Sequence, residues 1–166
     1  MTVSPLPGPP ESGYSLTCLS GGQQDCADLH SYGPGIRRNY ILHYVLAGRG
    51  YFETNGQVYP VETGESFLIC PNTVIRYYPD PAQPWEYTWV DFCGGEAQTL
   101  LRRTGFTAAR PVSPALSRET MEPLYRSIRE SCGPMPWHRA RADGYLLVLL
   151  SRYRGRDPFC DPFCGS

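Results

Sequence analysis

The sequence predicts a mainly β protein, in which an antiparallel sheet closes into a barrel or sandwich and about three C-terminal α-helices follow. Between residues 14 and 93, short segments rich in aromatic and β-branched residues succeed one another, each closed by turn residues and with no helix between them. Of the 21 aromatic residues, 12 lie between Tyr40 and Phe92. After Gly94-Gly95 the apolar period becomes helical. With 166 residues, the chain is long enough for one domain with its own core.

The strand segments are read from their turn residues. A first strand is expected at 14–19, ended by a turn at Gly21-Gly22, and Gly33-Pro34-Gly35 breaks the chain again. Asn55-Gly56 predicts a tight hairpin, because both central positions of a type I′ turn need positive φ. Further strands are expected at 40–46, 51–54, 57–61, 66–70, 74–78 and 85–92.

Three helical segments follow the strands, at about 96–104, 114–131 and 139–154. In the third, Leu146, Leu149, Leu150 and Tyr153 fall at i, i+3, i+4 and i+7, which is one face of a helix. This stripe fits packing on the barrel as well as it fits a partner helix in a dimer. Leu147 and Val148 broaden the apolar surface beyond that face.

Charge excludes several classes of function. All 15 basic residues are Arg, against 16 acidic residues, so there is no basic nucleic-acid footprint and no lysine for Schiff-base or P-loop chemistry. Residues 1–93 carry nine acids and four Arg, a net charge of −5, whereas residues 94–166 carry seven acids and eleven Arg, a net charge of +4. The two halves therefore have different roles.

Cysteine use and hydropathy predict a soluble, cytoplasmic protein. The seven cysteines are odd in number and form no CxxC pair, so neither a disulfide framework nor a zinc knuckle is indicated. Cys160 and Cys164 lie four apart but lack two further ligands for a metal. No segment approaches the ~20 apolar residues of a membrane span, and the Pro-rich amino end has no signal core.

The histidines argue against a metal-dependent enzyme. A metal-binding barrel needs a close cluster of His and Glu or Gln, but His30, His43 and His138 are far apart in the sequence and none is paired on a strand. A catalytic Cys or Ser would need a His base oriented by an acid, and the sequence offers few candidates for such a base. No phosphate loop or dinucleotide fingerprint is present. We predict no catalytic residue, metal or cofactor.

Strand alternation gathers aromatic residues on one face. Trp85, Tyr87, Trp89 and Asp91 share a face of 85–92. Ile75 and Tyr77 likewise share a face of 74–78. Aromatic rings with polar tips suit a sugar, which offers CH faces for stacking and hydroxyls for hydrogen bonds. The alternative, which the residues alone favour, is that they fill the barrel core, and a histidine such as His43 in an apolar run is more often a core residue than a ligand contact.

Three motifs resemble the amino-terminal sensor domain of AraC-type transcription regulators. The run 38–52 (RNYILHYVLAGRGYF) is similar to the start of that domain, 64–71 (GESFLICP) to its Gly-Asp-x-x-Leu-x-x-Pro turn and strand, and 84–92 (PWEYTWVDF) to its tryptophan-rich strand. The resemblance implies a cupin-like barrel (double-stranded β-helix or jelly roll) that binds a small effector, commonly a sugar. It also implies an arm that closes over the pocket and helices that dimerise.

The resemblance also implies site residues. The ring-stacking tryptophan falls on Trp89, but the family's clamping arginine falls on Gly33 and its pocket histidine on Tyr87, so arabinose itself is not favoured. Arg37 or Arg38 is a candidate replacement for the clamp. The expected ligand-binding residues are Trp89, Tyr77, Tyr87, Ile75, His43, Arg38 and Ile41, and the expected dimer contacts are Leu146, Leu149, Leu150 and Tyr153.

These observations divide the chain into a Pro-rich arm at 1–13, an effector-binding barrel at 14–93, a helical dimerisation segment at 94–156 and a linker at 157–166. The expected function is effector sensing, for a monosaccharide or disaccharide, in a homodimer that reaches DNA only through a helix-turn-helix half absent from this chain. Two alternatives remain: a small cupin enzyme acting on a sugar or keto acid, and a purely structural dimerisation module with a filled barrel.

Overall fold

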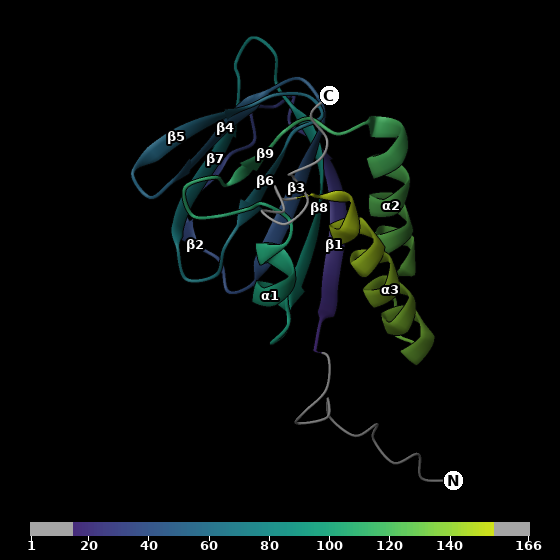
Figure 1. Cartoon of the computed structure of the whole chain (residues 1–166). Helices are drawn as coiled ribbons and strands as arrows, with labels where there is room; N and C mark the ends of the chain where they lie inside the picture. The colour runs from purple at the N-terminus through teal and green to yellow at the C-terminus, as the bar shows by residue number, and fades with distance from the viewer. Residues whose placement is uncertain (1–14, 155–166) are drawn as a thin grey trace, which may run out of the picture.

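Two antiparallel sheets face each other, and α2 and α3 lie side by side against the outer face of one of them (Figure 1). The structure is a computed structural model that describes residues 15–154. The strands are β1 (Thr17–Asp25), β2 (Tyr32–Ile36), β3 (Tyr40–Ala47), β4 (Gly50–Thr54), β5 (Gln57–Val61), β6 (Ser66–Ile69), β7 (Val74–Pro79), β8 (Glu86–Cys93) and β9 (Val112–Ser113). The helices are α1 (Ala97–Arg102), α2 (Arg118–Ser131) and α3 (Pro136–Arg152).

The strand order confirms the predicted fold class. The first sheet has the order β1-β8-β3-β6-β9, and the second sheet has the order β2-β7-β4-β5, with antiparallel pairing throughout. The expected hairpin joins β4 to β5, and both of its turn residues have positive φ, 51° at Asn55 and 73° at Gly56. Mainly antiparallel sheets followed by helices are what the turn chemistry predicted.

The apolar run at 40–46 is explained by two cores that share the first sheet. Ile41, His43 and Val45 of β3 face the second sheet, inside the barrel. Leu42 and Tyr44, with opposite parity, face the helices. A strand buried on both faces reads as continuous apolar sequence, which is why this segment does not alternate.

The expected turn at Gly21-Gly22 is wrong, because β1 runs straight through both glycines. Gly22 lies opposite Trp89 in the ladder, and a Cβ at this position would overlap the six-membered ring of Trp89. Glycine is required here because a ring lies across the main chain, not because the chain turns. The expected break at Gly33-Pro34-Gly35 similarly falls inside β2, where the pairing with β7 is irregular.

The segment expected to be helical also contains one strand. β9 pairs with β6 at the edge of the first sheet, so that Phe67 lies opposite Val112. With two residues, β9 is too short to show a recognisable alternation of apolar and polar side chains. The helix that was expected from about residue 114 begins after this strand, at Arg118.

The four side chains expected at a dimer interface are buried within the chain, which corrects that expectation. Leu146 and Leu149 have no exposed surface, and Leu150 and Tyr153 are only 4% and 3% exposed. The hydroxyl of Tyr153 lies 2.8 Å from Ser66 Oγ of β6. The stripe therefore packs on the barrel, and a face already covered in one chain is not available to a second copy.

The expected arm at 1–13 and the whole of the expected linker at 157–166, with Cys160 and Cys164, lie outside the described residues. Between residues 15 and 154, none of the helices combines the length and apolar character of a membrane span.

Candidate ligand-binding site

A cavity of about 280 Å³ lies between the two sheets, on the inward face of the first sheet. Its walls come from β1, β3, β7 and β8 and from the segments that flank β2. The lining residues are Ser20, Gln24, His30, Arg37, Ile41, His43, Tyr77, Tyr87, Trp89 and Asp91.

Trp89 forms a flat wall of this cavity. Its ring lies across Gly22 of β1, with ring centroids of Tyr87 and His43 at 6.0 and 6.2 Å. Since the main chain of β1 supports one side of the indole, the ring is held flat against the barrel wall. Such a surface is suited to stacking on the CH face of a ring-shaped ligand.

His43 is packed from several sides and lacks one hydrogen-bond partner. Its imidazole stacks on Phe67 with centroids 4.5 Å apart, and Tyr77 and Tyr87 lie at 5.1 and 4.9 Å. Burial, with a further contribution from Arg37, lowers the pKa of His43 to about 3. The ring is therefore neutral at physiological pH and offers one donor and one acceptor, while its buried Nδ1 has no partner.

Arg37, rather than the expected Arg38, reaches the cavity. The Arg37 guanidinium lies 3.7 Å from the ring centroid of Tyr32, and its Nη2 donates a 3.5 Å hydrogen bond to the Tyr77 hydroxyl. Arg38 is exposed and does not line the cavity. Both arginines lie in the connection between β2 and β3, and only Arg37 faces the cavity.

Asp91 places a carboxylate in the same cavity. Burial raises the pKa of Asp91, while a hydrogen bond from Asn39 and the charge of Arg37 lower it. One oxygen, Oδ1, is buried and has no partner. Asp91 shares the inward face of β8 with Trp89, so an acceptor lies on the same strand face as the stacking surface.

Three buried polar atoms without partners come from residues that line this one cavity. They are Arg37 Nε, a donor, Asp91 Oδ1, an acceptor, and His43 Nδ1, which is either. Buried polar groups are nearly always hydrogen-bonded, to protein groups or to ordered water, so these three residues give the cavity a polar side where a bound molecule can form hydrogen bonds. Two larger hollows, of about 400 and 450 Å³, are lined by no side chain with such an atom among the described residues.

Five of the seven residues expected at a ligand site line the cavity: Trp89, Tyr77, Tyr87, His43 and Ile41. Ile75 is buried inside the barrel but does not line it, and Arg38 is exposed. The residues that the prediction missed are Ser20, Gln24, His30 and Asp91, and Arg37, the alternative to Arg38, lines the cavity in its place. Asp91 could have been predicted, because it alternates onto the same face of β8 as Trp89. Ser20 and Gln24 could not, because a turn was wrongly expected at Gly21-Gly22.

The described residues contain no group of three or more His, Cys, Asp or Glu side chains that could hold a metal ion. What the cavity offers is a stacking surface, a guanidinium, a carboxylate and a neutral imidazole. This arrangement suits the binding of a small polar molecule through hydrogen bonds and ring contact.

A barrel with a polar-lined cavity on one face of a sheet and helices on the other is the architecture of a small-molecule-binding domain. The sequence model of the family described as AraC-like ligand binding domain matches residues 20–150, and the chain belongs to this family. The cupin-like barrel implied by the sequence motifs is thereby confirmed.

Two curated relatives are similar in sequence to part of this chain. The chain is 32% identical over 91 residues to the Msm operon regulatory protein of Streptococcus mutans, a match that covers 55% of this chain and 33% of the relative. It is 33% identical over 84 residues to the raffinose operon transcriptional regulatory protein RafR of Pediococcus pentosaceus, covering 49% and 30%. The chain thus spans about a third of the length of these relatives.

In structure, the chain is similar to ToxT K231A from Vibrio cholerae, with a TM-score of 0.55 and 8% identity, covering 86% of this chain and 56% of that one. At this identity the likeness concerns the fold alone.

Proposed function

We propose that this chain is the effector-binding part of a cytoplasmic transcription regulator of the AraC family and that its effector is a small sugar. Family membership supports the regulatory role, and the operon named for the RafR relative supports a sugar. We expect the regulator to contact DNA through a separate helix-turn-helix part, as the resemblance to the family implies.

The observation that carries this proposal is the set of three unpartnered polar atoms beside the Trp89 indole. A sugar ring presents hydroxyls that both donate and accept, so a single ring can accept from Arg37 Nε, donate to Asp91 Oδ1 and bond with His43 Nδ1. Its CH face stacks on Trp89 at the same time.

The size of the cavity favours one sugar ring. Pockets for drug-sized ligands run from about 300 to 1,000 Å³, and a volume of about 280 Å³ lies just below that range. We therefore expect a monosaccharide, or one terminal ring of a longer sugar, to occupy the space between the sheets.

Isothermal titration calorimetry with a panel of neutral monosaccharides and disaccharides tests the proposal, using two matched pairs of variants. Arg37→Met removes a cavity guanidinium, whereas Arg38→Met removes the exposed neighbour. We expect about a tenfold or greater loss of affinity for the first, because hydrogen bonds to charged groups contribute ~1.5–3 kcal/mol, and no change for the second.

The second pair concerns the stacking surface. Trp89→Ala is expected to abolish measurable binding, and Trp137→Ala, at an indole that is 56% exposed on α3, to leave it intact. Binding that is equally strong in all four variants contradicts the assignment of the sugar to this cavity.

A further inference from the structure

We propose that Gly22, Thr88 and Arg129 form a positioning bridge through the first sheet, which sets the orientation of the Trp89 ring from the helix side. The consequence for ligand affinity rests on the proposed function. The positioning of the ring does not, and it can be measured without any ligand.

On the inner side of the sheet, the Trp89 ring packs against Gly22. The two residues are partners in the β1–β8 ladder, and the position of a Cβ at Gly22 is occupied by Cζ2 and Cη2 of the indole. The ring therefore rests directly on the main chain of β1. Any displacement of this main chain moves the surface that supports the ring.

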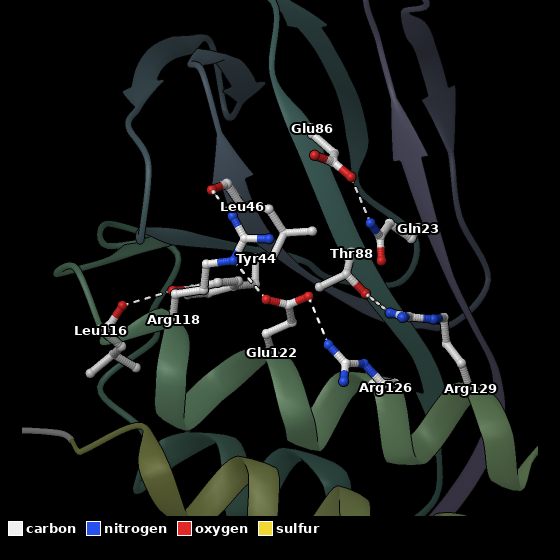
Figure 2. A network of polar contacts seen from close by, with 10 residues as sticks. All are labelled: Gln23, Tyr44, Leu46, Glu86, Thr88, Leu116, Arg118, Glu122, Arg126 and Arg129. Atoms are coloured by element: carbon white, nitrogen blue, oxygen red, sulfur yellow. Dashed lines mark hydrogen bonds and ion pairs between the residues drawn. The ribbon is translucent and has the colours of Figure 1, made fainter.

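On the outer side, the same main chain is held by two hydrogen bonds in series. Thr88 Oγ1 donates to the carbonyl oxygen of Gly22 at 2.8 Å, and Arg129 Nη1 of α2 donates to Thr88 Oγ1 at 2.8 Å. Figure 2 shows Arg129 reaching from α2 toward Thr88 on the strand. Thr88 has no exposed surface, so water does not replace either bond without a rearrangement.

The bridge acts on a part of β1 that has little else to fix it. β1 is an edge strand, paired on one side only, and Gly21 and Gly22 have no side chains to pack. At Gly21, Arg129 Cγ and Ile128 Cγ2 of α2 lie 3.4 and 3.5 Å from where a Cβ would be. α2 thus lies directly on the glycines whose other side carries the Trp89 ring.

A ligand that stacks on Trp89 and a displacement of the end of α2 are therefore linked through three residues. Linkage is reciprocal, so a change at α2 that disturbs Gly22 weakens ligand binding, and ligand binding favours the α2 position that supports the ring. Thr88 and Arg129 are positioning residues, since neither lines the cavity.

The first test records the indole N–H signals of the three tryptophans by NMR in the ligand-free chain, with Trp89→Phe to assign the Trp89 signal. Thr88→Val keeps the shape of the side chain but removes the hydroxyl, and Thr88→Ser restores it. We expect Thr88→Val to shift the Trp89 signal, Thr88→Ser to return it toward the wild-type position, and the Trp137 signal to stay in place.

Arginines on the same helix provide a matched control. Arg129→Met breaks the bridge, while Arg118→Met removes an arginine whose Nη1 donates to the Leu46 carbonyl oxygen at 3.5 Å, elsewhere on the barrel (Figure 2). We expect only Arg129→Met to shift the Trp89 signal. An unchanged Trp89 signal in both Thr88→Val and Arg129→Met overturns the proposal.

The second test measures affinity for the sugar that binds best in the panel above. We expect Thr88→Val and Arg129→Met to weaken it about three- to tenfold, the effect of one lost hydrogen bond, while Thr88→Ser and Arg118→Met stay within about twofold. Equal affinity in all four forms, with sugar bound by the wild type, counts against the bridge. If the wild type binds no sugar, the proposed function fails, and the NMR signals still decide the positioning.

Discussion

His43 is kept neutral by its packing, and this has a consequence for stability. In the unfolded chain the pKa of His43 is near 6.5, whereas burial lowers the pKa of His43 in the folded chain to about 3. Between these values the unfolded chain binds more protons than the folded chain, so stability falls as the pH falls. His43 is 2% exposed, and solvent screening does little to weaken this effect.

We expect the free energy of unfolding of the wild type to fall by about 1.4 kcal/mol per pH unit below pH 6.5 through this residue alone. His43→Phe, which does not titrate, is expected to lack this part of the slope. Urea denaturation at several pH values between 6.5 and 4.5 measures the difference between the two proteins. Parallel curves contradict the neutral, buried imidazole.

At the residue scale, the sequence identified side chains on regular strands better than side chains in connections. Alternation along β8 placed Tyr87 and Trp89 together, and both line the cavity. The choice between Arg37 and Arg38 could not be made in this way, because both lie between two strands where alternation carries no information. Ser20 and Gln24 were missed because a glycine pair that accommodates an aromatic ring has the same sequence as a turn.

At the element scale, α3 presents two apolar faces with different roles. One face, which includes Leu149, is buried against the barrel and α2. We expect Leu149→Ala to lower the free energy of unfolding by about 2–5 kcal/mol, as for other leucines removed from a packed core. Chemical denaturation measures this, and a loss below 1 kcal/mol, about the scale of a surface substitution, contradicts the packing.

The other face of α3 is exposed and apolar. Trp137, Leu147 and Val148 are 56%, 37% and 41% exposed, and Gly144 leaves open space between them. Exposed apolar side chains of this kind are typical of protein contacts. If the chain forms the homodimer expected of such a domain, this face is our candidate for the contact, in place of the buried stripe.

Val148→Arg is therefore expected to convert a dimer to a monomer in sedimentation velocity without lowering the melting temperature of the fold. Arg152→Ala, near the exposed end of the same helix, serves as the control. A Val148→Arg protein that sediments as a dimer removes this face from consideration. The sequence indicated that apolar residues surround α3, but only the position of the barrel decides which of them are covered.

At the scale of the whole molecule, the cavity and the helices occupy opposite faces of the first sheet. The two cores lie on either side of the strands of this sheet, whose alternate side chains belong to one core or the other. Turn chemistry and aromatic density were enough to predict this class of fold. The volume between the sheets and the polar atoms left unpartnered there depend on how the sheets face each other, which no local pattern encodes.

Because the ligand binds only the folded chain, a sugar present at 100 times its dissociation constant is expected to stabilise the fold by about 2.7 kcal/mol. Thermal denaturation with and without sugar measures this as a rise in melting temperature. Asp91→Asn, which replaces the carboxylate acceptor in the cavity, is expected to reduce the rise at the same sugar concentration. An equal rise in both proteins contradicts a role for Asp91 in binding.

We propose above all that a sugar ring binds between the sheets and stacks on Trp89. The most direct measurement is a titration of the chain with neutral monosaccharides, followed by the NMR signal of the Trp89 indole N–H. We expect at least one monosaccharide to shift the Trp89 signal in a saturable manner and to leave the exposed Trp137 signal unchanged. A monosaccharide that binds tightly by calorimetry without moving the Trp89 signal contradicts stacking on this ring.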